Sequence, residues 1–148
     1  MLMKDRFKEL MPEISSIKRI SEDGEIYWHV FDNEKTSLGY AFFIAVPETD
    51  DPNLDVEEFD KYEVACVISL EYQVLSLKIS EHPEGPDNMW AEDIIEDEFA
   101  QQYLNRPAKE MYLAPEGAID AISDGTLSSK LMTDSIRDKI ISIKDSTQ

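Results

Sequence analysis

The sequence predicts an α+β domain in which an antiparallel meander sheet of about five strands is covered by C-terminal helices. Five runs of alternating or β-branched apolar residues are separated by short turn signals, and helical periodicity replaces alternation in the last third of the chain. The 148 residues, 42% of them hydrophobic, suffice for one domain with a buried core and are too few for two. We therefore expect residues 1–148 to form a single folding unit.

The N-terminal part of the chain is expected to form one helix and three strands. Apolar residues recur at helical spacing from Met3 to Met11 and Pro12 ends the pattern, so a short amphipathic helix should cover the sheet. Strands are predicted at Ile17–Ile20, Glu25–Asp32 and Leu38–Val46. The polar turns between them have hairpin length, which favours antiparallel pairing of neighbouring strands.

Two further strands and two helices are expected after this. Tyr62–Leu70 and Tyr72–Ile79 alternate in polarity and should pair as antiparallel neighbours. Helical spacing then predicts one helix over Met89–Leu104 and another from Leu127 or Ser128 to Ile143. Both helices should cover the sheet with their apolar stripes. The side chains expected to face inward include Ile94, Phe99, Ile136 and Ile140.

Acidic residues dominate the charge of the chain. There are 32 Asp and Glu against 14 Lys and Arg, which gives a formal net charge of −18. This charge repels phosphates and anionic lipid surfaces, so direct binding to nucleic acid is disfavoured. The segment Glu48–Asp60 should be exposed and mobile, because it has little apolar surface to bury. Solubility is the common explanation of such acidity. The alternative is a surface that docks a basic partner, or a nucleic-acid mimic that occupies the basic groove of another protein.

Several other classes of site find no support in the pattern. Cys66 is the only cysteine and lies in an apolar run, so it is expected to be a buried side chain. Neither His29 nor His82 has a partner at a metal-ligand spacing. No nucleophile stands beside a base, and no stretch approaches the roughly 20 apolar residues of a membrane span. We expect a soluble, cytoplasmic protein without hydrolase or transferase activity.

The most informative chemistry lies between Ala118 and Lys130, where a short apolar run, a hydroxyl-rich turn and a helix start follow one another. The first amides of a helix have no internal partners and the helix dipole favours an anion, while Gly125 permits close backbone approach. This segment can therefore cradle a phosphate. From spacing alone, a plain helix cap by Thr126 or Ser128 is the commoner structure.

The same segment resembles the flavinylation motif of the FMN-binding domain family, which occurs in subunits of Na⁺-pumping NADH:quinone reductase and Rnf-type complexes. The family pattern is Asp, two variable residues, Ser or Thr, Gly, Ala, Thr, one variable residue, Ser or Thr, and Ser. The matching residues here are Asp120, Ser123, Thr126, Ser128 and Ser129. The resemblance implies an FMN-carrying electron-transfer module with redox protein partners. It further implies that Thr126 can accept FMN through a phosphoester bond made by a separate Mg²⁺-dependent flavin transferase.

Weaker resemblances cover most of the chain. Residues 7–12 with 39–41 are similar to the family's first helix and strands, and residues 99–103 are similar to the segment that precedes the motif. Residues 82–86 resemble its His-x-Glu-Thr-Pro-Gly loop in a shifted and incomplete form. The family's N-terminal membrane anchor is missing, which suggests either a soluble stand-alone member or an excised extracytoplasmic domain of a membrane-anchored subunit.

The motif also departs from the family pattern. Asp124 stands where the family has Gly, and Gly125 stands where it has Ala. The Asp124 carboxylate should weaken phosphate binding by like-charge repulsion, which weighs against covalent attachment.

Residues outside the motif are candidates for contact with the flavin ring. Trp90, Tyr112 and Leu113 can form an apolar wall, although ordinary core packing explains them as well. His82 and Glu84 can hydrogen-bond the flavin, or belong to a plain exposed loop. The alternative function is a flavin-free acidic binding protein of the same fold that docks a basic partner.

Overall fold

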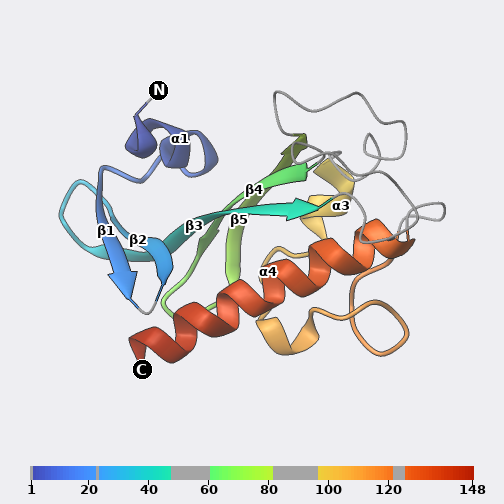
Figure 1. The fold of residues 1–148 in the computed structure, drawn as a ribbon. Coiled ribbons are helices and arrows are strands. Elements are labelled where there is room, and N and C mark those ends of the chain that lie inside the picture. The colour runs from blue at the N-terminus through green and yellow to red at the C-terminus, as the bar shows by residue number, and fades with distance from the viewer. Residues whose placement is uncertain (1, 23, 48–60, 82–96, 122–125) are drawn as a thin grey trace.

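The computed structural model describes residues 2–22, 24–47, 61–81, 97–121 and 126–148 (Figure 1). Five antiparallel strands form one meander sheet in the order β1-β2-β3-β4-β5, which confirms the expected α+β class. The strands are β1 (Ser16–Glu22), β2 (Glu25–Phe31), β3 (Ser37–Pro47), β4 (Lys61–Ile68) and β5 (Val74–Glu81). The predicted antiparallel pairing of the last two strands is confirmed by the register, in which Cys66 faces Leu77.

Helices cover both faces of the sheet (Figure 1). Helix α1 (Met3–Leu10) lies on one face, and the long helix α4 (Thr126–Thr147) crosses the other. The short helix α3 (Asp97–Gln101) and the 3₁₀ turn η1 (Ala108–Glu110) lie on the same face of the sheet as α4. Because strand side chains alternate between faces, β3 and β4 supply apolar residues to both layers.

The core is divided by the sheet into two apolar clusters. On the α1 side, Phe7 is fully buried and packs with Val30, Ala41 and Val67. The larger cluster lies under α4, where Phe99, Ile136 and Ile140 are buried as expected. Ile94 lies outside the described residues. Cys66 is also buried in this cluster, and burial raises the pKa of its thiol.

The predicted start of the last strand at Tyr72 is wrong, because this residue belongs to the preceding turn. Its φ of 64° is incompatible with a strand, and β5 begins two residues later at Val74. The Ser69 hydroxyl accepts hydrogen bonds from the backbone N–H groups of Glu71 and Gln73, at 3.2 Å each. Ser side chains often stabilise turns in this way, and these hydrogen bonds hold Tyr72 in the turn between β4 and β5.

The predicted helix over residues 89–104 also ends earlier than expected. Its described part, α3, stops at Gln101, and Leu104 instead forms a parallel bridge with Val74. The backbone N–H of Asn105 donates to the Val74 oxygen at 2.7 Å. Pairing with the open edge of β5 thus outweighs the helical periodicity. Residues 89–96 of this prediction lie outside the described residues.

The C-terminal helix is longer than its apolar pattern predicts. It continues to Thr147, four residues beyond the predicted end at Ile143. The extension is held by one side chain of the β4–β5 turn and one of β2, since the Tyr72 hydroxyl lies 2.6 Å from the Thr147 hydroxyl and Tyr27 donates to Ser146 at 3.3 Å. Among the described residues, no helix combines the length and hydrophobicity needed to cross a membrane. The acidic segment Glu48–Asp60 lies outside the described residues.

Candidate functional site

The predicted phosphate site lies at the beginning of α4. This helix starts at Thr126, at the end of the sheet where β3 ends and close to α3 (Figure 1). For Thr126 and Ser128 the structure describes the backbone, which is helical. Ser129, in the first turn, is fully buried, so the beginning of the helix is packed into the domain. The motif residues Ser123 and Gly125, and the departing residue Asp124, lie outside the described residues.

The chain that leads into the motif turn is held by a side chain of the α3 region. The backbone N–H of Asp120 donates to the Gln102 Oε1 at 2.6 Å, and the Gln102 Nε2 donates to the Asp120 oxygen at 3.2 Å. Asp120 itself is exposed. Its backbone is therefore fixed while its carboxylate faces solvent.

A tight loop before Asp120 carries two of the predicted wall residues. Leu113 forms a parallel bridge with Ile119, and Ala114 donates its N–H to the Ile119 oxygen at 2.9 Å. A Cβ on Gly117 would lie 2.2 Å from the Tyr112 oxygen, so the close approach of residue 117 to the Tyr112 backbone requires glycine. The loop thus presents Tyr112 at the surface, and Leu113 is half-buried against the core under α4.

Tyr112 is a surface residue, so core packing does not account for it. Its side chain is 45% exposed, and the Arg137 guanidinium lies 4.3 Å from the ring centroid. Arg137 also donates to the Met111 oxygen at 3.2 Å, which fastens the loop to α4. Arg137 follows Thr126 by eleven residues, about 16 Å along a helix. The structure therefore does not bring Tyr112 to the first turn of α4, and only an elongated ligand could contact both.

The other predicted ring contacts cannot be placed. His82, Glu84 and Trp90 lie outside the described residues. Sequence reasoning missed Gln102, Tyr103 and Arg137, which hold the segments around the motif. The only sequence signal for the first two was their place in the run Phe99–Tyr103, which precedes the motif.

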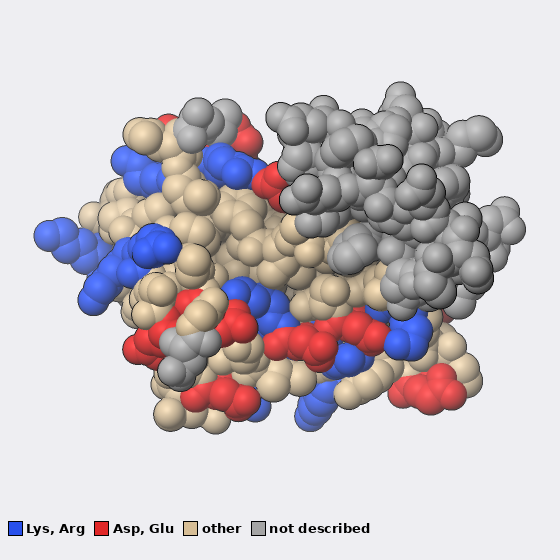
Figure 2. All heavy atoms as spheres, in the orientation of Figure 1, with Lys and Arg blue, Asp and Glu red and all other residues tan. Residues whose placement is uncertain are grey.

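The surface around α4 carries intermingled charges (Figure 2). Lys130 and Arg137 both pair with Asp134, at 2.6 and 2.8 Å. Burial raises the pKa of the Asp134 carboxyl, but its hydrogen bonds with Lys130 and Arg137 outweigh this and lower it. In the described part of the chain, no three His, Cys, Asp or Glu side chains gather as metal ligands would.

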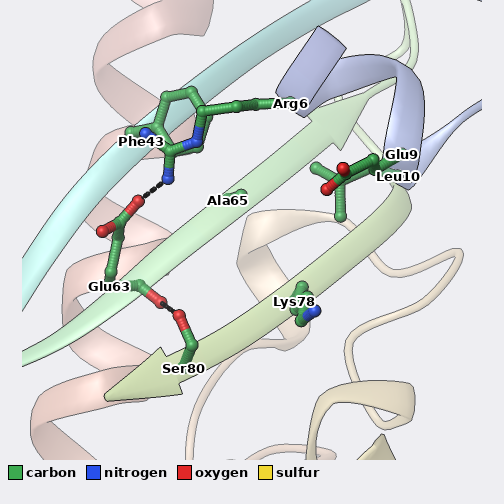
Figure 3. Close-up of a pocket in the computed structure, with 8 residues that line it drawn as sticks. All are labelled: Arg6, Glu9, Leu10, Phe43, Glu63, Ala65, Lys78 and Ser80. Carbon is green, nitrogen blue, oxygen red and sulfur yellow. Dashed lines mark hydrogen bonds and ion pairs between the residues drawn. The ribbon is translucent and has the colours of Figure 1, made fainter. Parts of the chain in front are cut away.

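Three hollows on the described surface are lined by residues outside α4. One of about 200 Å³ lies between α1 and β3–β5, where Arg6 packs on the Phe43 ring and pairs with Glu63 (Figure 3). Lys78 of β5 stands across from this ion pair. Others, of about 170 and 430 Å³, lie beside β5 and beside the β2–β3 turn. A flavin-sized ligand usually needs roughly 300 Å³ or more, and the largest of the three lies on the α1 side.

His29 of β2 is the one titratable histidine within the described residues. Its ring packs against Phe31 and Tyr40, and its Nε2 lies 2.5 Å from the Ser37 hydroxyl. Burial lowers its pKa below the ordinary value of 6.5, and the nearby charge of Lys18 lowers it further. The folded state therefore favours neutral His29.

This shift predicts a pH dependence of stability. The His29 contribution should be complete above about pH 6.5 and should be lost as the pH falls through the lower pKa of the folded state, because the unfolded chain then binds more protons. Urea unfolding at pH 7.5 and 5.5 measures this. His29→Gln should reduce the loss of unfolding free energy on acidification. An equal loss in wild type and His29→Gln would contradict the assignment.

Comparison of the chain with models of known families finds no match, and a search of curated proteins finds none either. The likeness to FMN-binding domains therefore rests on the motif residues themselves.

Proposed function

We propose that this domain carries FMN as an electron-transfer module, with the flavin phosphate at the N-terminus of α4. The observation that supports the proposal most directly is the position of the motif. Thr126 is the first residue of a 22-residue helix, and Asp120 precedes it in the chain. A helix of this length presents free amides and a positive dipole end to an anion. The first turn of α4 contains no acidic residue that would neutralise this end.

The surroundings of the helix start also suit an anchored phosphate. Ser129 is buried in the first turn and Thr133 in the second, so this end of the helix is packed into the domain. Asp120 is held by Gln102 on the other side of the turn. Preorganised donors of this kind bind a ligand without first having to be ordered.

FMN, when bound, supplies the electron-transfer chemistry, and the chain supplies anchoring and orientation. The exposed ring of Tyr112 and the half-buried Leu113 offer apolar surface farther along α4. A ligand whose phosphate lies at the helix start and whose ring system extends toward Tyr112 would use both features. A flavin transferase and redox proteins are the partners that this proposal requires.

One feature of the charge distribution favours the second candidate function, which is docking of a basic partner without flavin. Residues 48–60 contain seven acidic side chains, residues 82–96 contain five, and neither segment has a Lys or Arg. Both segments join the described chain at the end of the sheet where α4 begins (Figure 1). The net charge of −18 attracts cationic surfaces and repels a phosphate.

Titration of the purified domain with FMN tests the proposed function. Quenching of flavin fluorescence should report saturable binding, and a protein that retains flavin should be yellow. Asp124→Gly should bind FMN more tightly than wild type, because it removes one like charge beside the phosphate. If neither protein binds FMN, the flavin proposal fails and the acidic docking protein takes its place.

The net charge of −18 predicts an unusual salt dependence of this binding. Raising KCl from about 10 mM to about 300 mM should strengthen FMN binding severalfold, because the Debye length falls from roughly 30 Å to below 10 Å and screens the repulsion. Riboflavin, which lacks the phosphate, is the matched control and should bind with little salt dependence. If FMN binding weakens as salt is added, the protein attracts the phosphate more than it repels it, and this prediction is wrong.

A further inference from the structure

A hollow of about 200 Å³ opens on the face of the sheet that α1 covers (Figure 3). Ala65 of β4 lies at its floor and is half-exposed, although β4 has a neighbouring strand on each side. The register places Phe43 of β3 and Lys78 of β5 beside it on the same face. Val67, two residues further along this face, is fully buried under α1. The small side chain of Ala65 therefore leaves a space between two longer side chains.

Helix α1 forms one wall of this hollow and is fastened to the sheet at two points. The Arg6 guanidinium lies 4.1 Å from the centroid of the Phe43 ring and pairs with Glu63 of β4. Four residues later, the Leu10 oxygen accepts a hydrogen bond of 2.9 Å from the Ser76 hydroxyl of β5. Because residues four apart lie on the same side of a helix, both contacts hold the side of α1 that lines the hollow. The space is therefore formed before any ligand arrives, which favours binding.

The ionisable side chains around the hollow are balanced in charge. They are Arg6, Glu9, Glu63 and Lys78. Arg6 and Glu63 neutralise each other in their ion pair, whereas Lys78 and Glu9 form no ion pair within the described residues. Both are exposed and have long side chains, which can turn toward a ligand in the hollow. The hollow thus offers one ammonium and one carboxylate whose charges no ion-pair partner in the described chain neutralises.

Size and charge together restrict the ligand. A volume of about 200 Å³ holds about six or seven waters at ~30 Å³ each, so the hollow suits a molecule of amino-acid size and is too small for flavin. The net charge of −18 repels a small anion, and a small cation would meet two like charges, Arg6 and Lys78, at the hollow. A zwitterion has no net charge and can pair with both free groups. Phe43, Ala65 and Leu10 add apolar surface that a short hydrocarbon side chain can cover.

We propose that this hollow binds a small zwitterion of the α-amino-acid class, with its carboxylate at Lys78, its ammonium at Glu9 and an apolar side chain against Phe43. Hydrogen bonds between ionised groups are about twice as strong as neutral ones, and two of them fix the orientation of the ligand. The site uses none of the motif residues and lies on the opposite face of the sheet from α4 (Figure 1). It is therefore a second ligand site, independent of the proposed function.

Titration with L-leucine, followed by the NMR signals of the backbone amides, tests this inference. The amides of Ala65 and Lys78 should shift saturably. Two probes built on the same hydrocarbon chain separate the charges, since isoamylamine lacks the carboxylate and isocaproate lacks the ammonium. Each should bind at least about tenfold more weakly than L-leucine, because one charge-assisted hydrogen bond is lost. The zwitterion site is overturned if L-leucine causes no saturable shift, or if either probe binds as tightly as L-leucine.

Two variants assign each charge to its partner. Lys78→Met keeps the length of the side chain and removes its charge, so the Kd for L-leucine should rise at least about tenfold while the Kd for isoamylamine does not rise. Glu9→Gln should weaken L-leucine binding by a similar factor and should not weaken isocaproate binding. Both residues are exposed, so the variants should fold as wild type does. A variant that leaves L-leucine binding as it is, or that weakens the probe without the matching charge equally, contradicts the assigned contact.

Lys18→Met is the matched control, because it changes the net charge by the same amount at the other edge of the sheet. Lys18 lies on β1 and likewise forms no ion pair in the part of the chain that the structure describes. Its Kd for L-leucine should equal that of wild type. Ala65→Leu fills the hollow and should abolish L-leucine binding. If this variant binds L-leucine as wild type does, the ligand lies elsewhere and the inference fails. A wild type that binds L-leucine but not FMN would retain this site and lose only the proposed function.

Discussion

Coexpression with a Mg²⁺-dependent flavin transferase is expected to raise the intact mass of the domain by that of FMN less one water, and Thr126→Val is expected to abolish the increase. In the transfer, the threonine hydroxyl attacks the flavin-side phosphate of a flavin dinucleotide donor, its proton is lost, and the nucleoside monophosphate leaves as the pyrophosphate bond breaks. Valine replaces this hydroxyl with a methyl group at nearly the same volume. Thr126 is the first residue of α4, so a phosphate esterified to it would lie beside the free amides of the helix. Intact-mass spectrometry reads the outcome directly.

Two variants make this result specific. Ser128→Ala removes a neighbouring motif hydroxyl and should leave the mass increase in place. Asp124→Gly restores the glycine of the family pattern and should raise the modified fraction above that of wild type, because one like charge is removed. A mass increase that survives Thr126→Val would assign the acceptor elsewhere. Should neither wild type nor Asp124→Gly gain the mass or bind free FMN, the docking function would replace the flavin proposal.

Gly39→Ala is expected to destabilise the domain by about 3–5 kcal/mol, at the severe end of the range for single substitutions. Gly39 of β3 has a φ of 141°, a conformation that side chains other than glycine rarely adopt. An added Cβ would lie 1.9 Å from the backbone oxygen of Ile68, so β3 and β4 would have to separate. Urea unfolding followed by circular dichroism measures the loss.

Gly24→Ala is the control for this prediction. Gly24 also has a positive φ, of 83°, but a Cβ there would meet no atom within 4 Å. Only the conformational cost remains, roughly 1–2 kcal/mol. Equal losses for the two variants would show that the approach of Ile68 to Gly39 carries no cost of its own.

Much of the fold was readable from local patterns. Alternation placed all five strands, because each strand of this meander pairs with its neighbour in sequence and requires no information about distant segments. Helical periodicity placed α1 and α4 for the same reason. The two errors have different causes. Tyr72 is drawn into a local turn closed by Ser69, whose hydroxyl side chain competes with the strand pattern. Leu104 leaves the helical pattern because it pairs with Val74 of a distant segment.

The candidate site likewise has one part that the sequence predicts and one part that depends on tertiary contacts. The hydroxyl-rich turn and the helix that follows are local in sequence, so the sequence alone predicted a helix start at Leu127 or Ser128, and α4 begins one residue earlier, at Thr126. Contacts between distant segments decide which of these residues are exposed and which side chains hold the motif in place. Only the tertiary structure decided that Tyr112 lies at the surface under Arg137, that Gln102 holds Asp120, and that Tyr103 meets Thr133. Each of these contacts joins residues 18 to 30 positions apart, and side-chain contacts over such separations leave no periodic trace in a sequence.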